Sequence, residues 1–214
     1  MIFGSERERA FAKLNRDLKK VAKKNGTEVN DIVELANNEA RYPELIPTLV
    51  DWYGDVDSKT TLSDPRDRAQ FLDAISRSLI TREARGTNAF ALAVRYLESH
   101  PCTNQSNFQG AGILVAYLAK KPDTEDMIRL ACDRYLGEAR VPILDWLLRS
   151  KKPDLIDVAV GELADSPVAA HIMRELRKLS YVPVGIEDLV RSYLQCEQEE
   201  SRKQARLLLP KMGK

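Results

Sequence analysis

The chain of 214 residues is 43% apolar and 30% charged, and its acidic and basic residues almost cancel to a formal net charge of +1. This apolar content supports a buried core. The near-neutral charge balance excludes a strong overall electrostatic field that would by itself attract an anionic partner. Three cysteines, at positions 102, 132 and 196, lack the spacing of a disulfide framework or a zinc site. The first residues lack a signal-peptide pattern and no apolar run is long enough to span a membrane, so we expect a cytoplasmic protein without membrane contact.

The N-terminal 42 residues are expected to form a helical cap. Residues 5–24 have helix-forming composition, and Gly26 stops that helix. A second, shorter helix is expected over residues 28–38. The first helix is strongly basic, which suits either a solvated outer face or an arm for an anionic surface. Its predicted apolar stripe consists of Phe11, Leu14, Leu18 and Val21.

From residue 43 onward, apolar residues recur at helical spacing in a succession of helix pairs. Polar loops separate the helices, and the first such loop is residues 54–63. Start signals such as Asp64-Pro65 mark where the next helix begins. No region is strand-like for long enough to compete, so the predicted class is all-α. The five expected pairs are 45–52 with 64–85, 90–97 with 113–118, 123–136 with 140–149, 154–164 with 167–179, and 184–194 with 199–211.

One tetrapeptide occurs twice at helix-hairpin distance. Lys120-Lys121-Pro122-Asp123 returns as Lys151-Lys152-Pro153-Asp154, 31 positions later. In both copies the lysines are expected to end one helix, the proline cannot continue it, and the aspartate can cap the next one. Ser166, ahead of Pro167, is expected to act as a cap in the same way. Such recurrence indicates stacked repeat units.

Residues 43–212 resemble the HEAT and armadillo class of α-solenoids. The resemblance rests on antiparallel helix pairs of roughly 30 to 40 residues, prolines near the unit starts, and an arginine-alanine step such as Arg68-Ala69. It implies a right-handed α-solenoid of about five antiparallel helix pairs over residues 43–214, with residues 1–42 as capping helices of the same domain. Members of this class are curved scaffolds whose second helices line the concave face and bind other macromolecules, and most of them catalyse nothing.

Charge alternates between the helices of the last three pairs, because the first helices are acidic and the second helices are basic. If the class geometry holds, the basic residues form one exposed stripe that contacts a partner. The alternative is that acids at helix N-termini and bases at C-termini complement the helix dipoles and pair with their neighbours. The predicted partner-binding residues are Arg149, Arg174, Arg177, Arg202, Lys203 and Arg206.

Catalytic constellations are nearly absent from the sequence. The two histidines, His100 and His171, fall in different units, and no phosphate loop or metal-ligand spacing occurs. We therefore expect no catalytic residue, no metal and no cofactor. The exception concerns Asp51-Trp52 and Asp145-Trp146, which are similar in outline to the carboxylate and tryptophans of HEAT-like DNA-alkylation glycosylases. A structural tryptophan in the core is the alternative for both.

Two hypotheses follow from a predicted repeat architecture whose sequence contains almost no catalytic constellation. The first is a non-enzymatic binding module, of adaptor or immunity type, that presents its basic second helices to an acidic protein partner. The second is binding of duplex nucleic acid through the same stripe and the basic first helix, with base excision as an extension. Salt discriminates between them, because phosphate contacts weaken steeply as salt rises.

Overall fold

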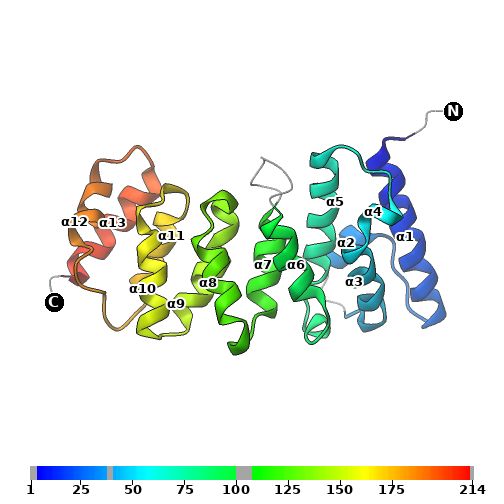
Figure 1. Cartoon of the computed structure of the whole chain (residues 1–214), viewed down its shortest axis with the longest axis horizontal. Coiled ribbons are helices and arrows are strands. Elements are labelled where there is room, and N and C mark those ends of the chain that lie inside the picture. Colours follow the sequence, from blue (N-terminus) through cyan, green and yellow to red (C-terminus); the bar gives the residue numbers. More distant parts are fainter. Residues whose placement is uncertain (1–3, 38–40, 100–107, 213–214) are drawn as a thin grey trace. The chain divides into compact units, whose positions relative to one another are not determined.

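The computed structural model describes residues 4–37, 41–99 and 108–212. Every regular element in these ranges is helical, so the all-α class is confirmed (Figure 1). The chain forms two compact units, unit 1 over Met1–Lys120 and unit 2 over Lys121–Lys214. The boundary falls inside the first copy of the repeated tetrapeptide. His100 and Cys102 lie outside the described residues.

Unit 1 begins with α1, whose N-terminus is fixed by a capping box. Ser5 Oγ accepts the amide of Glu8 at 3.2 Å, and Glu8 Oε2 accepts the amide of Ser5 at 2.7 Å. The polar loop expected at residues 54–63 contains a short helix, α4, because Val56 is buried there and anchors it. The α-helices of unit 1 are α1 Glu6–Lys24, α2 Ile32–Asn37, α3 Ile46–Gly54, α4 Val56–Lys59, α5 Pro65–Ser78, α6 Ala89–Glu98 and α7 Gln109–Leu118.

Unit 2 contains helices at the positions expected for the last three predicted pairs. The helix expected over residues 123–136 ends at Cys132, because Asp133 leaves the helical conformation and its carboxylate accepts the amide of Tyr135 at 3.1 Å. A 3₁₀ segment, η5 Arg134–Arg140, follows. The α-helices of unit 2 are α8 Thr124–Cys132, α9 Val141–Arg149, α10 Pro153–Gly161, α11 Ser166–Leu176, α12 Glu187–Ser192 and α13 Glu199–Met212.

The core of unit 1 is organised around Trp52, which is 1% exposed. Its ring lies 5.9 Å from that of Phe71, which lies 4.9 Å from that of Phe11. The indole Nε1 of Trp52 donates to Asp17 Oδ2 at 3.1 Å, so the one polar atom of this buried ring is satisfied. The expectation of a structural tryptophan is therefore confirmed at this position.

The predicted stripe of α1 is only partly correct. Leu14 and Leu18 are buried, but Phe11 and Val21 are half-buried, and Ala10 and Ala22 complete the buried row instead. The row therefore follows i, i+4 spacing, and the two alanines let the neighbouring helices approach closely. α1 uses this row against α2, α3 and α5.

The two copies of Lys-Lys-Pro-Asp adopt different conformations. Lys121–Asp123 forms a 3₁₀ turn, and Asp123 is at the N-cap of α8 without a side-chain capping bond. In the second copy, Pro153 is the first residue of α10 and Asp154 lies inside the helix, so the predicted Asp154 cap is wrong. Lys151 takes a positive φ of 58° and turns the chain there. The Ser166 cap is also wrong, because Asp165 is at the N-cap of α11.

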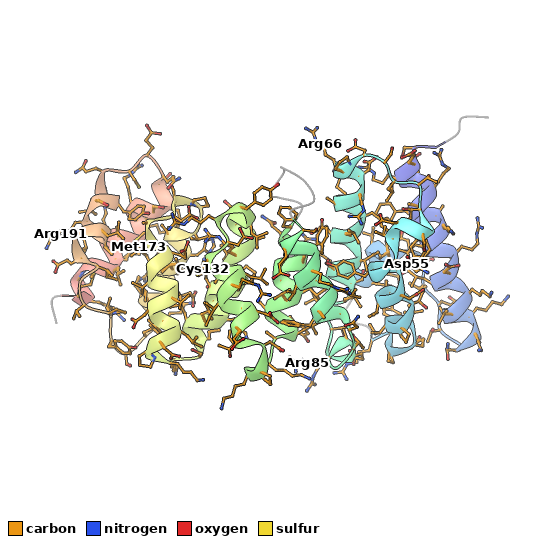
Figure 2. The ribbon with its side chains drawn as sticks, viewed as in Figure 1. Asp55, Arg66, Arg85, Cys132, Met173 and Arg191 are labelled. Carbon is orange, nitrogen blue, oxygen red and sulfur yellow. The ribbon has the colours of Figure 1, made fainter. Side chains whose placement is uncertain are left out.

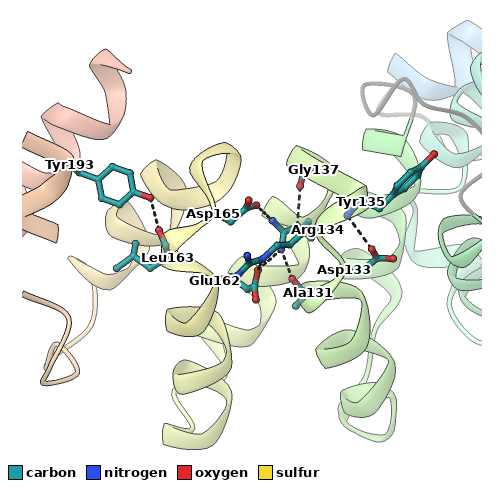
Figure 3. A network of polar contacts seen from close by, with 10 residues as sticks. Ala131, Asp133, Arg134, Tyr135, Gly137, Glu162, Leu163, Asp165 and Tyr193 are labelled. Atoms are coloured by element: carbon teal, nitrogen blue, oxygen red, sulfur yellow. Dashed lines mark hydrogen bonds and ion pairs between the residues drawn. The ribbon is translucent and has the colours of Figure 1, made fainter. Parts of the chain in front are cut away.

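A fully buried arginine connects the middle helices of unit 2. Arg140 Nη1 donates to the carbonyl of Ala131 at 2.9 Å and to Glu162 Oε2 at 2.8 Å, and Nη2 pairs with Asp165. Figure 3 labels these three partners, together with Arg134, which also pairs with Glu162. Its Nε donates to the carbonyl of Gly137 at 3.3 Å. Although the sequence places Arg140 among the bases of the second helices, it is 0% exposed and belongs to the core.

Candidate functional site

The second helices of unit 2 lie next to one another, because α11 contacts both α9 and α13. These three helices carry all six predicted partner-binding residues. Arg149 ends α9, Arg174 and Arg177 lie at the end of α11, and the remaining three belong to α13. We call this set of helices the second-helix surface.

The six bases differ in exposure. The side chains of Arg149 and Lys203 are 73% and 63% exposed, and Arg206 is also exposed. Arg174, Arg177 and Arg202 are half-buried. The expectation of largely exposed bases therefore holds for three of them, and these three offer the most accessible positive charge.

Acidic side chains on the same helices neutralise part of this charge. Glu175, with a side chain only 6% exposed, lies 3.5 Å from Arg174 Nε and 2.5 Å from Lys178 Nζ. Arg149 pairs with Asp145 at 3.7 Å. In α13, Lys203 pairs with Glu200 at 3.5 Å. The surface is thus a mixture of both signs, as expected if intramolecular pairing accounts for many of the bases.

Two further bases hold the backbone and side chains of unit 2 in place. Arg177 Nη1 donates to Gln204 Oε1 at 2.7 Å, which joins α11 to α13. Arg202 Nη1 donates to the carbonyls of Cys196 and Glu197 at 2.6 and 2.8 Å, just before α13 begins. Substituting either residue would therefore disturb the fold as well as the surface.

Asp145 is an acid of this surface whose pKa is raised. Its side chain is 15% exposed, and burial, followed by repulsion from Glu175, raises its pKa above the ordinary value. Its Oδ1 is buried and makes no hydrogen bond to the part of the chain that is described. Arg174 Nη2 lies 2.9 Å from His171 Nδ1 nearby. The sequence singled out Asp145 beside Trp146, but it did not predict the role of Glu175 or the pairing of Asp145 with Arg149, although the two stand four residues apart and thus in ion-pair register.

The two Asp-Trp steps have different roles. Trp52 lies in the core of unit 1, and Asp51 pairs with Lys59 at 2.9 Å. Trp146 is half-buried on α9, beside Asp145. Only the second step therefore combines a perturbed carboxylate with a solvent-accessible indole.

A separate cavity of about 380 Å³ lies in unit 1. Its lining combines apolar side chains of α2 and α3 with Arg41, Arg77 and Arg82. Arg41 pairs with Glu83 at 3.7 Å and Arg77 with Asp73 at 2.7 Å, so two of these guanidinium groups already have acidic partners. None of the six predicted bases lines this cavity.

Comparison of the chain with protein-family models, with curated proteins and with solved structures gives no match. Within residues 4–37, 41–99 and 108–212, no group of three or more His, Cys, Asp or Glu side chains is placed to hold a metal ion. In the same ranges no helix is both long and apolar enough to cross a bilayer. The assignment of function therefore rests on the surfaces of the two units.

Proposed function

We propose that the protein is a non-enzymatic binding module, built as a right-handed α-solenoid of HEAT type, whose second-helix surface contacts an acidic protein partner in the cytoplasm. The observation that carries the proposal is the position of the six predicted bases on three neighbouring helices of one unit. Arg149, Lys203 and Arg206 would contact the partner directly. Arg174, Arg177 and Arg202 would hold the helices and complete the positive surface.

The intramolecular ion pairs do not prevent such contacts. The pairs Arg149–Asp145 and Lys203–Glu200 are 3.7 and 3.5 Å long and involve highly exposed bases. The pair Lys203–Glu200 is exposed on both sides and therefore contributes about 0–1 kcal/mol, and the partly buried Asp145 holds Arg149 only at 3.7 Å. A carboxylate of a partner can therefore replace or share them at little cost. Arg206 has no ion pair or hydrogen bond with the residues that the structure describes.

Charge reversal of the three exposed bases tests the proposal. The variant Arg149→Glu/Lys203→Glu/Arg206→Glu should keep its fold, since exposed substitutions usually change stability by about 0.5 kcal/mol or less each. The matched control is Arg66→Glu/Lys121→Glu/Lys152→Glu, which makes the same change in net charge at exposed positions elsewhere. Tagged full-length proteins would be used to capture partners from native lysate, and each captured protein would be identified.

An acidic protein retained by the wild type and by the control, but lost from the first variant, would support the proposal. Like-charge contacts across an interface cost several kcal/mol, so the loss should be nearly complete. Capture of the same proteins by all three chains would contradict it. Retention of no stoichiometric protein by the wild type would do the same.

Asp145 and Trp146 support a second candidate function, base excision on alkylated duplex DNA. A carboxylate with a raised pKa beside a half-buried indole is the observation that favours it. Incubation of the full chain with methylated duplex DNA should then release free methylated base, and Asp145→Asn should abolish the release. Absence of any release by the wild type would exclude this candidate while leaving the protein-binding proposal intact.

A further inference from the structure

The first helix carries a charge that the rest of the chain does not share. α1 contains eight cationic residues and three acidic ones, a net charge of +5, whereas the whole chain has +1. The remaining residues therefore sum to −4. A local excess of this size within one 19-residue helix is not explained by the composition of the protein.

The three acids of α1 are all engaged within unit 1. Glu6 Oε2 accepts the amide of Ser63 at 3.0 Å, and this bond lowers the pKa of Glu6. Glu8 closes the capping box, and Asp17 accepts the indole N–H of Trp52. None of these carboxylates forms an ion pair with the lysines of the same helix in the described structure. All three acids therefore make contacts that stabilise unit 1, and none of them neutralises a lysine of α1.

The cations of α1 also separate into two groups. Arg7 pairs with Asp67 of α5 at 3.2 Å and serves the fold. At 100° per residue, the other seven fall within an arc of about 140°, opposite the buried row of Ala10, Leu14, Leu18 and Ala22. These seven are Arg9, Lys13, Arg16, Lys19, Lys20, Lys23 and Lys24, and all are exposed.

Five of the seven have no partner among the described residues, namely Arg16, Lys19, Lys20, Lys23 and Lys24. α1 is the outer edge of unit 1, and nitrogen-tipped side chains extend from its free side (Figures 1 and 2). We call this side, with its seven cations, the α1 face. It is about 22 Å long from Arg9 to Lys24, at 1.5 Å per residue.

We propose that the α1 face binds the phosphate backbone of double-stranded nucleic acid without sequence preference. Lysine supplies five of its seven cations, and lysine is depleted in protein–protein interfaces whereas phosphates are routinely contacted by lysine and arginine. The face carries no aromatic side chain on which an unpaired base could stack, which favours a duplex over a single strand. Its apolar side is buried in unit 1, so the helix has nothing to insert into a lipid surface.

The expected salt dependence follows from the number of free cations. Five phosphate contacts give a slope of about −4.5 in log affinity against log salt on duplex DNA, or about 500-fold weaker binding at 200 mM than at 50 mM. The probe is a fluorescein-labelled duplex of 20 base pairs with arbitrary sequence, and the readout is fluorescence anisotropy with the full chain. A second duplex of unrelated sequence should bind equally well.

The test variant is Lys19→Glu/Lys20→Glu/Lys23→Glu, with Arg66→Glu/Lys121→Glu/Lys152→Glu as the control of equal net charge. The test variant should lose at least about tenfold in affinity at 50 mM salt, and its slope should fall to about −1.8 as two contacts remain. The control should bind like the wild type. Lys19→Gln/Lys20→Gln/Lys23→Gln avoids placing acids near the helix C-terminus and should show a smaller loss in the same direction.

The proposal is overturned if the wild type fails to bind the duplex at 50 mM salt, or if the control loses as much affinity as the test variant. It is also overturned if a 20-nucleotide single strand, or vesicles containing phosphatidylserine, bind more tightly than the duplex. Circular dichroism of all chains confirms that each is folded. Because the α1 face lies in unit 1 and the second-helix surface in unit 2, this result is independent of the protein-binding proposal.

Discussion

Replacing Arg140 by methionine should destabilise unit 2 strongly. The guanidinium is 0% exposed and has four partners, which are two backbone carbonyls and the carboxylates of Glu162 and Asp165. Methionine fills much of the same volume but donates no hydrogen bond. Glu162 would keep only Arg134, at 3.1 Å, and Asp165 would lose this ion pair. Breaking a buried ion pair by removing one partner costs about 3–5 kcal/mol.

This loss is a large fraction of the roughly 5–15 kcal/mol that stabilises a typical domain. Urea denaturation of the full chain, followed by circular dichroism, measures it as a shift in midpoint and free energy of unfolding. The control is Arg191→Met, because Arg191 forms an exposed i, i+4 pair with Glu187 and should lose only about 0–0.5 kcal/mol. Equal losses in the two variants, or a loss below about 1 kcal/mol for Arg140→Met, would refute the view that this network holds unit 2 together.

Three further predictions concern stability and its pH dependence. Gly110→Ala should cost about 1–3 kcal/mol, because the new Cβ would meet the Asp73 carboxylate and, at 3.0 Å, its carbonyl oxygen. Gly161→Ala, which meets nothing within 4 Å, should instead gain about 0.4–1 kcal/mol in the same denaturation assay. The raised pKa of Asp145 means that the folded state binds the extra proton, so stability should fall as pH rises from about 3.9 through the folded pKa. Asp145→Asn should flatten that part of the stability–pH profile, and an unchanged profile would contradict the burial argument.

The sequence predicted the helices well where apolar periodicity and start signals agree. Asp64 caps α5 through its side chain as expected, and Pro65 is the first helical residue. The prediction failed where two local choices compete within a few residues. At Lys152-Pro153-Asp154 the proline took the first helical position, which moved Asp154 inside the helix. Nothing in the tetrapeptide itself distinguishes this outcome from the 3₁₀ turn of the first copy.

The candidate site was harder to predict than the helices, because exposure and pairing depend on residues far away in the sequence. Arg140 and Arg149 have the same charge and bracket one helix, yet the first is in the core and the second is 73% exposed. The partners that bury Arg140 include Glu162 and Asp165, which lie 22 and 25 positions later. Periodicity within α9 carries no information about those contacts.

The net charge of a helix is therefore a poor guide to its partner, and the state of each charge is a better one. α9 carries one acid and one arginine and α11 does the same, so both are neutral along their helical lengths. α1 has fewer acids than bases, and each of its three acids already accepts a hydrogen bond within unit 1. A polyanion gains most from cations that have no neighbouring acid, because each contact releases a condensed counterion without breaking an existing pair. A protein partner with its own acidic and polar groups can instead exchange contacts with a mixed surface. This difference is the reason why we propose the phosphate backbone as the ligand of the α1 face and a protein as the partner of the second-helix surface.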